Sequence, residues 1–158
     1  MKVRSRARMV ALQALFEIDC VGHDMDVVLE SRLEDSNLPP SGQTFVLSLV
    51  HGVYARVEHL DRLIAKYAPE WPVDQMSVID RNILRIAIYE IATSESTPVK
   101  VAINEAVELA KTFGSGSSRR FVNGVLGSYV TQEQQLSWEE EEEGVLGQGT
   151  VSVISEVG

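Results

Sequence analysis

The sequence predicts an all-α protein built from about seven helices. Apolar residues recur three and four positions apart along most of the chain, and proline or glycine separates the resulting segments. Strict alternation of apolar and polar residues, the pattern of a strand, occurs only at Thr150–Ile154. A length of 158 residues suits one ordinary domain with its own core. We therefore expect helices with short connections, packed as one bundle or as two packed helical subdomains.

The first half of the chain contains four apolar patterns with helical spacing. The second is short and ends at Asn37 and Pro39–Pro40, because proline cannot continue a helix. A break near Gly52–Arg56 separates the third from the fourth, which Pro69 and Pro72 close. The patterns consist of Met9, Leu12, Leu15 and Phe16; then Val27–Leu33; then Phe45, Val46, Leu49, Val50 and Val53, starting near Ser41; then Val57, Leu60, Leu63 and Ile64.

The second half carries three more helical patterns with clear end signals. Ser77 can cap the first while Asp80 reaches back to it, in a variant of the capping box. Pro98 suits the first position of the next helix, and Gly114 supplies its stop. The apolar faces consist of Ile83, Leu84, Ala87, Ile88 and Ile91; then Ile103, Ala106, Val107, Ala110 and Phe113; then Phe121, Val122, Val125, Leu126 and Tyr129.

Residues 131–158 differ from the rest of the chain in charge and composition. The net charge is −9, but residues 1–130 hold all 14 basic residues against 16 acidic ones, a net charge of only −2. Five consecutive glutamates, Glu139–Glu143, precede a glycine-rich stretch with little apolar area to offset the entropy of ordering. We therefore predict a helical domain over residues 1–130 and a flexible acidic tail over residues 131–158.

Composition excludes several classes of protein. No apolar stretch is long enough to span a bilayer, and the N-terminus lacks the apolar region of a signal peptide. Cys20 is the only cysteine, so we expect no disulfide, no thiolate metal site and a reducing, cytoplasmic setting. His51 and His59 lie eight residues apart without a third ligand, which is a weak metal signal.

No arrangement of residues typical of catalysis is visible. Asp80 and Glu90 have Arg81 and Arg85 as neighbours, and such pairing predicts a solvated lattice of ion pairs rather than a general acid–base pair. We therefore expect a protein that is not an enzyme and needs neither cofactor nor metal.

A first group of basic residues lies at the N-terminus. Lys2, Arg4, Arg6 and Arg8 all precede Glu17, the first acidic residue, and so form a local basic arm. Such an arm attracts phosphate in a salt-dependent way that does not depend on sequence. A solvated face with no ligand would have the same composition.

A second basic group follows the glycine–serine loop at residues 114–118. Backbone N–H groups at a helix start can hold a phosphate, although the lysine of a nucleotide-binding loop is absent. Arg119 and Arg120 place two cations in the first helical turn, where the helix dipole disfavours them, so an anion bound there would explain them. Phe121 beside them suits stacking on an unpaired base, but also suits the core. A plain capping turn is the alternative for the loop.

Three stretches of the sequence carry recognisable motifs: RSRARMVALQALF at Arg4–Phe16, VIDRNILRIAIYE at Val78–Glu90 and TPVKVAINEAVELAKTFGSGSSRRFVNGVL at Thr97–Leu126. Together they resemble the NusB family of transcription antitermination factors. The third is the most specific, because it contains both INEAVELAK and FVNGVL. The resemblance covers about residues 2–130 in order.

The resemblance implies two packed helical subdomains and an RNA-binding function. Members of the family bind the boxA element of nascent ribosomal RNA transcripts together with NusE, a ribosomal protein that also acts in transcription. The pair, with other Nus factors, helps RNA polymerase to read through terminators and supports rRNA synthesis. We therefore expect boxA RNA, NusE and the RNA polymerase antitermination complex as partners.

The resemblance also assigns residues to two surfaces. The RNA-binding residues it implies are Lys2, Arg4, Arg6 and Arg8, together with Ser117, Ser118, Arg119, Arg120 and Phe121. The contacts it implies for NusE are Phe16, Asp80 and Glu90. Two features depart from the family: Gly116–Ser117 stands in a loop that is often acidic, and the acidic tail is unusually long. The run Glu139–Glu143 either aids solubility or folds back on the arginines and competes with RNA.

Two other interpretations use the same residues. A NusB-like domain also occurs at the front of rRNA cytosine methyltransferases, but these 158 residues contain neither the cofactor-binding fold nor the catalytic cysteine of such an enzyme. The second is a helical protein–protein scaffold without RNA binding, or a homodimer that uses the same faces.

Overall fold

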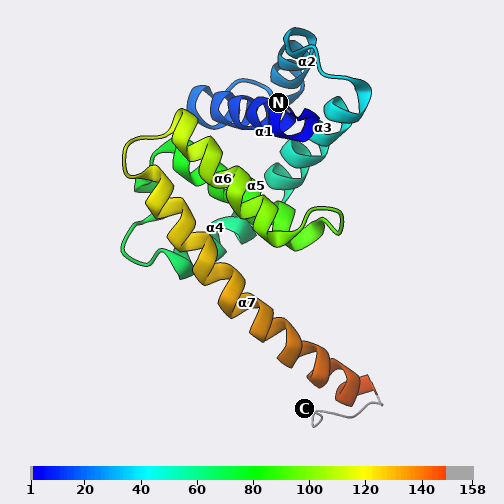
Figure 1. The fold of residues 1–158 in the computed structure, drawn as a ribbon, viewed down its shortest axis with the longest axis vertical. Coiled ribbons are helices and arrows are strands. Elements are labelled where there is room, and N and C mark those ends of the chain that lie inside the picture. The colour runs from blue at the N-terminus through cyan, green and yellow to red at the C-terminus, as the bar shows by residue number, and fades with distance from the viewer. Residues whose placement is uncertain (1, 149–158) are drawn as a thin grey trace. The chain divides into compact units, whose positions relative to one another are not determined.

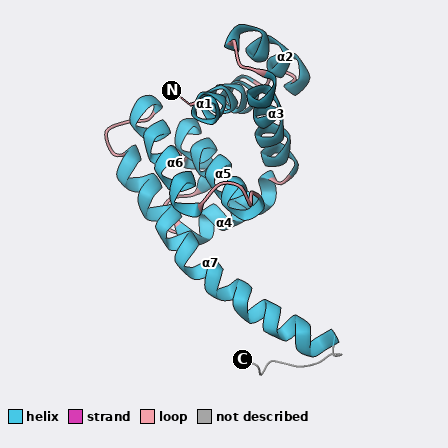
Figure 2. Ribbon diagram, turned by 45° about the vertical axis from the view of Figure 1, so that its right-hand side comes forward, coloured by secondary structure: helices cyan, strands magenta, loops and turns pink. Residues whose placement is uncertain are grey.

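The computed structural model describes residues 2–148, with side chains described as far as residue 133. Within these limits every regular element is helical (Figures 1 and 2), which confirms the all-α prediction and its seven helices. Two short turns, η1 and η2, are additional. The elements are α1 (Val3–Phe16), η1 (Glu17–Val21), α2 (Met25–Ser36), α3 (Pro40–Ala55), α4 (Val57–Tyr67), η2 (Val73–Gln75), α5 (Val78–Thr93), α6 (Val99–Phe113) and α7 (Ser118–Gln148).

Helix α5 lies at the centre of the compact unit formed by residues 1–126. Helices α1, α3, α4 and α6 all pack on it, and every residue from Asn82 to Ile88 is buried. The isoleucines and leucines of this helix supply apolar side chains for most of its surface, and the buried Asn82 and Arg85 form hydrogen bonds to Asp19. Helix α1 also packs on α2 and α3, so two groups of helices, α1–α3 and α4–α6, meet at α5 (Figure 1).

The basic residues at the N-terminus belong to a helix and do not form an arm. Helix α1 begins at Val3, and its inner face consists largely of alanines, with Ala7 and Ala11 fully buried. Alanine has the highest helix propensity, and its small side chain lets α1 approach α3 closely. The predicted basic group is therefore part of the first predicted helix, which begins at Val3.

Most predicted helix ends are confirmed. Helix α3 ends at Ala55 and α4 begins at Val57, within the expected break. The Ser77 hydroxyl accepts a hydrogen bond from the Asp80 backbone N–H at 3.0 Å, as a cap should. The second half of the predicted capping box is wrong, since Asp80 Oδ1 is buried and receives no hydrogen bond from any described group. Helix α6 begins one residue after Pro98 and stops before Gly114.

Helix α7 extends beyond the predicted domain boundary at residue 130. It remains helical to Gln148, because residues 131–148 contain no proline and are rich in glutamine and glutamate, which favour helix. A second compact unit begins at Gly127. The side chains of Glu139–Glu143 and the whole of Thr150–Ile154 lie outside the described residues, so the prediction for the glutamate run and that of a strand stay predictions.

Among the described residues, no helix combines the length and the apolar character that crossing a membrane requires. No group of three or more His, Cys, Asp or Glu side chains in this part of the chain could hold a metal ion.

Candidate nucleic-acid interface

Arg8 is buried, although it belongs to the predicted basic group. Its side chain donates to Glu90 through two nitrogens, and its Nη1 lies 3.4 Å from Glu105 Oε1. Arg8 is only 4% exposed and Glu90 only 2%. A buried arginine fork on a carboxylate joins helices and leaves neither charge for an outside partner. The predicted roles of Arg8 in RNA binding and Glu90 in partner binding are therefore corrected to a structural ion pair between α1, α5 and α6.

Arg6 also has partners within the chain. Its Nη2 donates to the backbone oxygens of Ser36 at 3.0 Å and of Asn37 at 3.3 Å. These carbonyls end α2, where a positive charge is favoured by the helix dipole. Arg6 therefore stabilises the end of α2, and its charge reaches solvent only in part.

Lys2 and Arg4 are the exposed members of this group. Arg4 donates from Nη1 to the hydroxyls of Ser96 and Thr97, each at 3.1 Å, and its guanidinium lies 4.5 Å from the centroid of the Phe45 ring. Its Nε and Nη2 make no hydrogen bond within the described residues. Lys2 occupies the cap position of α1 and has no partner there either. The ammonium group of Lys2 and the free N–H groups of Arg4 can bind a phosphate.

Ser118 shapes the turn between α6 and α7. Its hydroxyl oxygen accepts a hydrogen bond from the Ser115 backbone N–H at 2.9 Å, and the residue is 1% exposed. A Cβ at Gly114 would lie 2.4 Å from that oxygen, so the turn requires glycine there. The predicted RNA contact at Ser118 is therefore corrected to an internal role.

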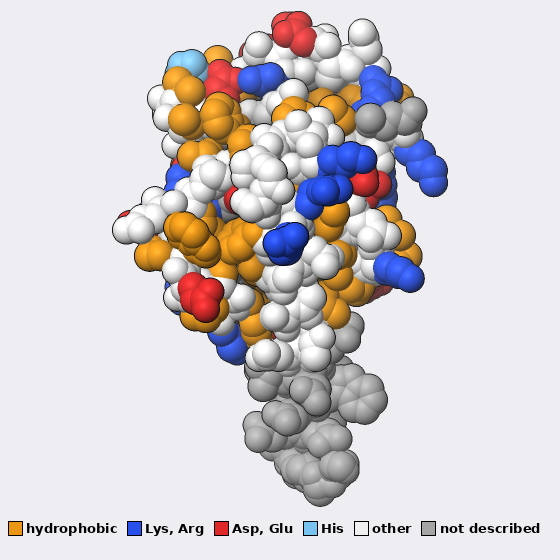
Figure 3. All heavy atoms as spheres, turned by 60° about the vertical axis from the view of Figure 1, so that its left-hand side comes forward, with side chains coloured by type: hydrophobic (Ala, Val, Ile, Leu, Met, Phe, Trp, Pro, Cys, Tyr) orange, Lys and Arg blue, Asp and Glu red, His pale blue; other side chains and the backbone are white. Residues whose placement is uncertain are grey.

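Arg119 and Arg120 are the predicted site residues that the structure leaves most available. Both are exposed, and neither makes an ion pair or hydrogen bond within the described chain. They stand in the first turn of α7, where the dipole opposes their charge and no carboxylate offsets it. Figure 3 shows basic side chains on one face of the molecule with apolar side chains between them. This combination suits the backbone and bases of a nucleic acid.

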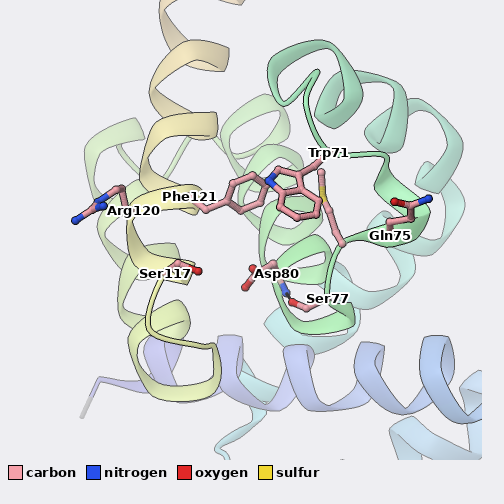
Figure 4. Close-up of a pocket in the computed structure, with 8 residues that line it drawn as sticks. Trp71, Gln75, Ser77, Asp80, Ser117, Arg120 and Phe121 are labelled. Carbon is pink, nitrogen blue, oxygen red and sulfur yellow. Dashed lines mark hydrogen bonds between the residues drawn. The ribbon is translucent and has the colours of Figure 1, made fainter.

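A pocket of about 470 Å³ adjoins this corner (Figure 4). Phe121 reaches into it from α7 towards Trp71, while Arg120 points away from both. The sequence did not predict Trp71 as a site residue, although an aromatic between Pro69 and Pro72 is a recognisable signal. The full lining is Trp71, Gln75, Met76, Ser77, Asp80, Ser117, Arg120 and Phe121.

Helix α6 lies between the basic residues of α1 and those at the start of α7. Its residues Glu108 and Thr112 line one hollow with Ser5 and Met9 of α1, and its C-terminal end leads directly into the Ser117–Phe121 corner. No hydrogen bond or ion pair within the described chain joins one basic group to the other.

The predicted partner residues do not form one cluster. Phe16 is half-buried at the end of α1, and Asp80 lies in the first turn of α5. The end of α1 and the start of α5 are linked through Asp19, which lies three residues after Phe16. Its carboxylate accepts hydrogen bonds from Arg81, the residue after Asp80, at 3.0 and 3.1 Å. Glu90 lies near the opposite end of α5.

The Asp19 carboxylate is the centre of a charged network. It also accepts from Asn82 at 3.1 Å and from Arg85 at 3.0 Å, and Arg85 in turn donates to Asp61. Burial raises the pKa of Asp19, but these hydrogen bonds and the two positive charges outweigh it and hold the pKa below its usual value of 3.8. The predicted solvated lattice around Arg81 and Arg85 is thus a partly buried network whose acids are Asp19 and Asp61.

Comparison with known proteins agrees with the resemblance seen in the sequence. Residues 5–131 match the model of the NusB family. The transcription antitermination protein NusB of Roseiflexus castenholzii is 51% identical over 137 residues, which cover 85% of this chain and 96% of the relative. That of Chloroflexus aggregans is 50% identical over 131 residues, covering 82% and 87%.

Solved structures share the fold. T. maritima NusB matches with a TM-score of 0.77 and 30% identity, over 85% of this chain and 96% of that one. A chain from a crystal structure of antitermination factors NusB and NusE with dsRNA matches with a TM-score of 0.74 and 25% identity, over 82% and 96%. The chain described here therefore belongs to the NusB family.

Proposed function

We propose that this chain is a transcription antitermination factor that binds the boxA RNA of rRNA transcripts together with NusE and promotes read-through by RNA polymerase. The observation that carries the proposal is the family match over residues 5–131. Relatives with about half of their residues identical are named transcription antitermination proteins. A structural neighbour was solved with NusE and dsRNA, which supports both partners.

The proposed RNA interface consists of the side chains that remain available after the internal ion pairs are formed. Arg119 and Arg120 supply uncompensated charge, and Lys2 with the free edge of Arg4 supplies the rest. Ser117 and Phe121 lie at the same corner as the two arginines. Arg6 adds a partly exposed positive charge next to this surface, and the buried Arg8–Glu90 pair holds α1 against α5. Phe16, at the end of α1, is the proposed contact for NusE.

A binding titration tests this function. Fluorescence anisotropy of a labelled boxA RNA, with and without NusE, is measured at 50 and 200 mM salt beside an RNA of scrambled sequence. We expect tighter binding to boxA than to the scrambled RNA, a further gain with NusE, and weaker binding at the higher salt as counterion release requires. Absence of RNA binding under all four conditions would favour the scaffold or homodimer, which light scattering detects.

A further inference from the structure

Arg4 is exposed, yet three contacts fix its guanidinium group. Its Nη1 donates to the hydroxyls of Ser96 and Thr97, each at 3.1 Å, and its Cζ lies 4.5 Å from the centroid of the Phe45 ring. Thr97 is buried and Phe45 is half-buried, so neither is a freely moving surface side chain. An exposed arginine normally samples many rotamers, and these contacts hold this one in a single orientation.

The Phe45 ring is itself held by a second arginine. The Cζ of Arg8 lies 5.2 Å from the centroid of the same ring, within the range of a cation–π contact. Two hydrogen bonds to the buried Glu90 fix Arg8 in turn. The buried ion pair between α1 and α5 is therefore linked through Phe45 of α3 to the exposed Arg4.

The orientation of Arg4 leaves its Nε–Nη2 edge without a partner among the described residues. Three other arginines of the chain use this edge on a carboxylate, in the pairs Arg8–Glu90, Arg81–Asp19 and Arg85–Asp61. A phosphate offers the same paired oxygens as a carboxylate, and two parallel N–H groups bind either of them. The free edge of Arg4 therefore fits an anion with two oxygens.

The space beside Arg4 is a hollow between α1 and α3. It has a volume of about 320 Å³, and Phe45 contributes to its wall. Helix α3 also lines it with three hydroxyl groups, those of Ser41, Thr44 and Ser48, and no carboxylate stands among the described lining residues. Hydroxyl side chains commonly donate to the phosphate and sugar oxygens of a nucleic acid. The hollow thus suits a phosphate of an RNA backbone.

We propose that Phe45 and Thr97 are positioning residues for RNA binding, which hold Arg4 so that its Nε–Nη2 edge binds one backbone phosphate. The inference rests on the proposed RNA-binding function and adds residues that the sequence did not predict for it. Arg119 and Arg120 have no such internal support, so they lose rotamer freedom when RNA binds, whereas Arg4 has lost it beforehand. Because a phosphate contact does not read sequence, the effect should be the same on boxA and on scrambled RNA.

A double-mutant cycle between Phe45 and Arg4 separates positioning from stability. Phe45→Leu removes the ring but keeps an apolar side chain, and we expect RNA affinity, measured by anisotropy, to fall about three- to tenfold. Arg4→Gln should lose at least as much, and Phe45→Leu added to it should cause no further loss. Phe45→Tyr keeps the ring and should bind as wild type does. Tyr54→Leu, which removes an exposed aromatic of the same helix, is the control.

The hydroxyl contacts are tested by Ser96→Ala/Thr97→Val, which removes both acceptors of Arg4 Nη1. We expect RNA affinity to fall about threefold, again only while Arg4 is present. Thr93→Val is the matched control, because the Thr93 hydroxyl is exposed and bonds to the backbone of its own helix.

The order of Arg4 can be measured without RNA. Nuclear magnetic relaxation of the arginine Nε–H groups reports how freely each side chain moves. In the free wild-type protein, we expect Arg4 to be more ordered than Arg62, an exposed arginine of α4. Phe45→Leu should make Arg4 as mobile as Arg62, while melting curves show that each variant is folded.

Two results would overturn the inference. One is a Phe45→Leu variant that loses no RNA affinity, or that loses the same amount with and without Arg4, since the ring would then act only on the fold. The other is an Arg4 Nε–H group that moves as freely as that of Arg62 in the wild-type protein. The proposed function fails separately, by a wild-type protein that does not prefer boxA to scrambled RNA, and that outcome leaves the relaxation of Arg4 unaffected.

Discussion

At the scale of single residues, tertiary partners decide which charges remain available for a ligand. The sequence places Arg4, Arg6 and Arg8 side by side, and nothing in their spacing separates them. In the fold, Arg8 is neutralised by Glu90, which lies 82 positions away. The basic groups can therefore be located from the sequence, but the burial of Arg8 depends on its distant partner Glu90.

Removing one partner of the Arg8–Glu90 pair should destabilise the protein strongly. Glu90→Gln leaves Arg8 buried with only the more distant Glu105, and we expect the free energy of unfolding to fall by about 3 kcal/mol. Urea denaturation measures this, with the exposed Glu108→Gln as control. The double variant Arg8→Met/Glu90→Met should recover part of the loss. A cost for Glu90→Gln no larger than that of Glu108→Gln would show that the pair is not structural.

Two glycines of the α6–α7 turn make a matched pair. A Cβ at Gly114 would lie 2.4 Å from Ser118 Oγ and 2.8 Å from the Ala110 backbone oxygen, whereas a Cβ at Gly116 meets nothing within 4 Å. We expect Gly114→Ala to lower the free energy of unfolding by about 1–3 kcal/mol, because the turn must shift. Gly116→Ala should be neutral or stabilise by up to about 1 kcal/mol. Thermal melts compare them, and equal effects would exclude the steric argument.

At the scale of elements, the ends of helices were predicted well where a capping residue or a proline lies next to them in the sequence. Ser77 caps α5 as expected, and the prolines after Tyr67 end α4. The π-helical turn at Glu17–Val21 was not predicted from the sequence. Asp19 lies in this turn and bonds to Arg81 and Arg85, more than 60 positions away. No pattern of apolar residues near Asp19 could indicate that link.

The link between η1 and α5 should depend on pH. Because the pKa of Asp19 is lower in the folded protein than its usual value of 3.8, its contribution is fully present above that value and is lost as the pH falls through the folded pKa. We expect Asp19→Asn to cost about 1.5–3 kcal/mol at pH 7, as for a hydrogen bond to a charged group. Urea denaturation at pH 7 and pH 3 checks the sign.

The exposed Glu30→Gln variant is the control for a general loss of negative charge. The difference between wild type and Asp19→Asn should shrink below about pH 4, since the wild-type carboxylate is then increasingly protonated. A difference that grows as the pH falls would contradict the assigned direction.

At the scale of the whole molecule, the candidate interface combines predicted and unpredicted parts. The corner that we propose for RNA binding was predicted from local context, because Arg119 and Arg120 stand against the helix dipole. The opposite wall of the pocket comes from Trp71, in the connection between α4 and α5, and only the fold brings it to Phe121. The flexible acidic tail predicted for residues 131–158 stays a prediction, although α7 is helical as far as Gln148.

We propose that RNA binds through positive charges that have no ion-pair partner among the described residues. The most direct test of this claim is the salt dependence of boxA RNA affinity for Arg119→Gln/Arg120→Gln, compared with Arg62→Gln/Lys100→Gln, an exposed pair of basic residues on other elements. We predict that the first variant binds at least tenfold more weakly and loses about 0.7 from the slope of log affinity against log salt for each phosphate contact removed, while the second keeps the wild-type slope. Equal slopes for the two variants, or a larger loss in the second, would contradict the claim.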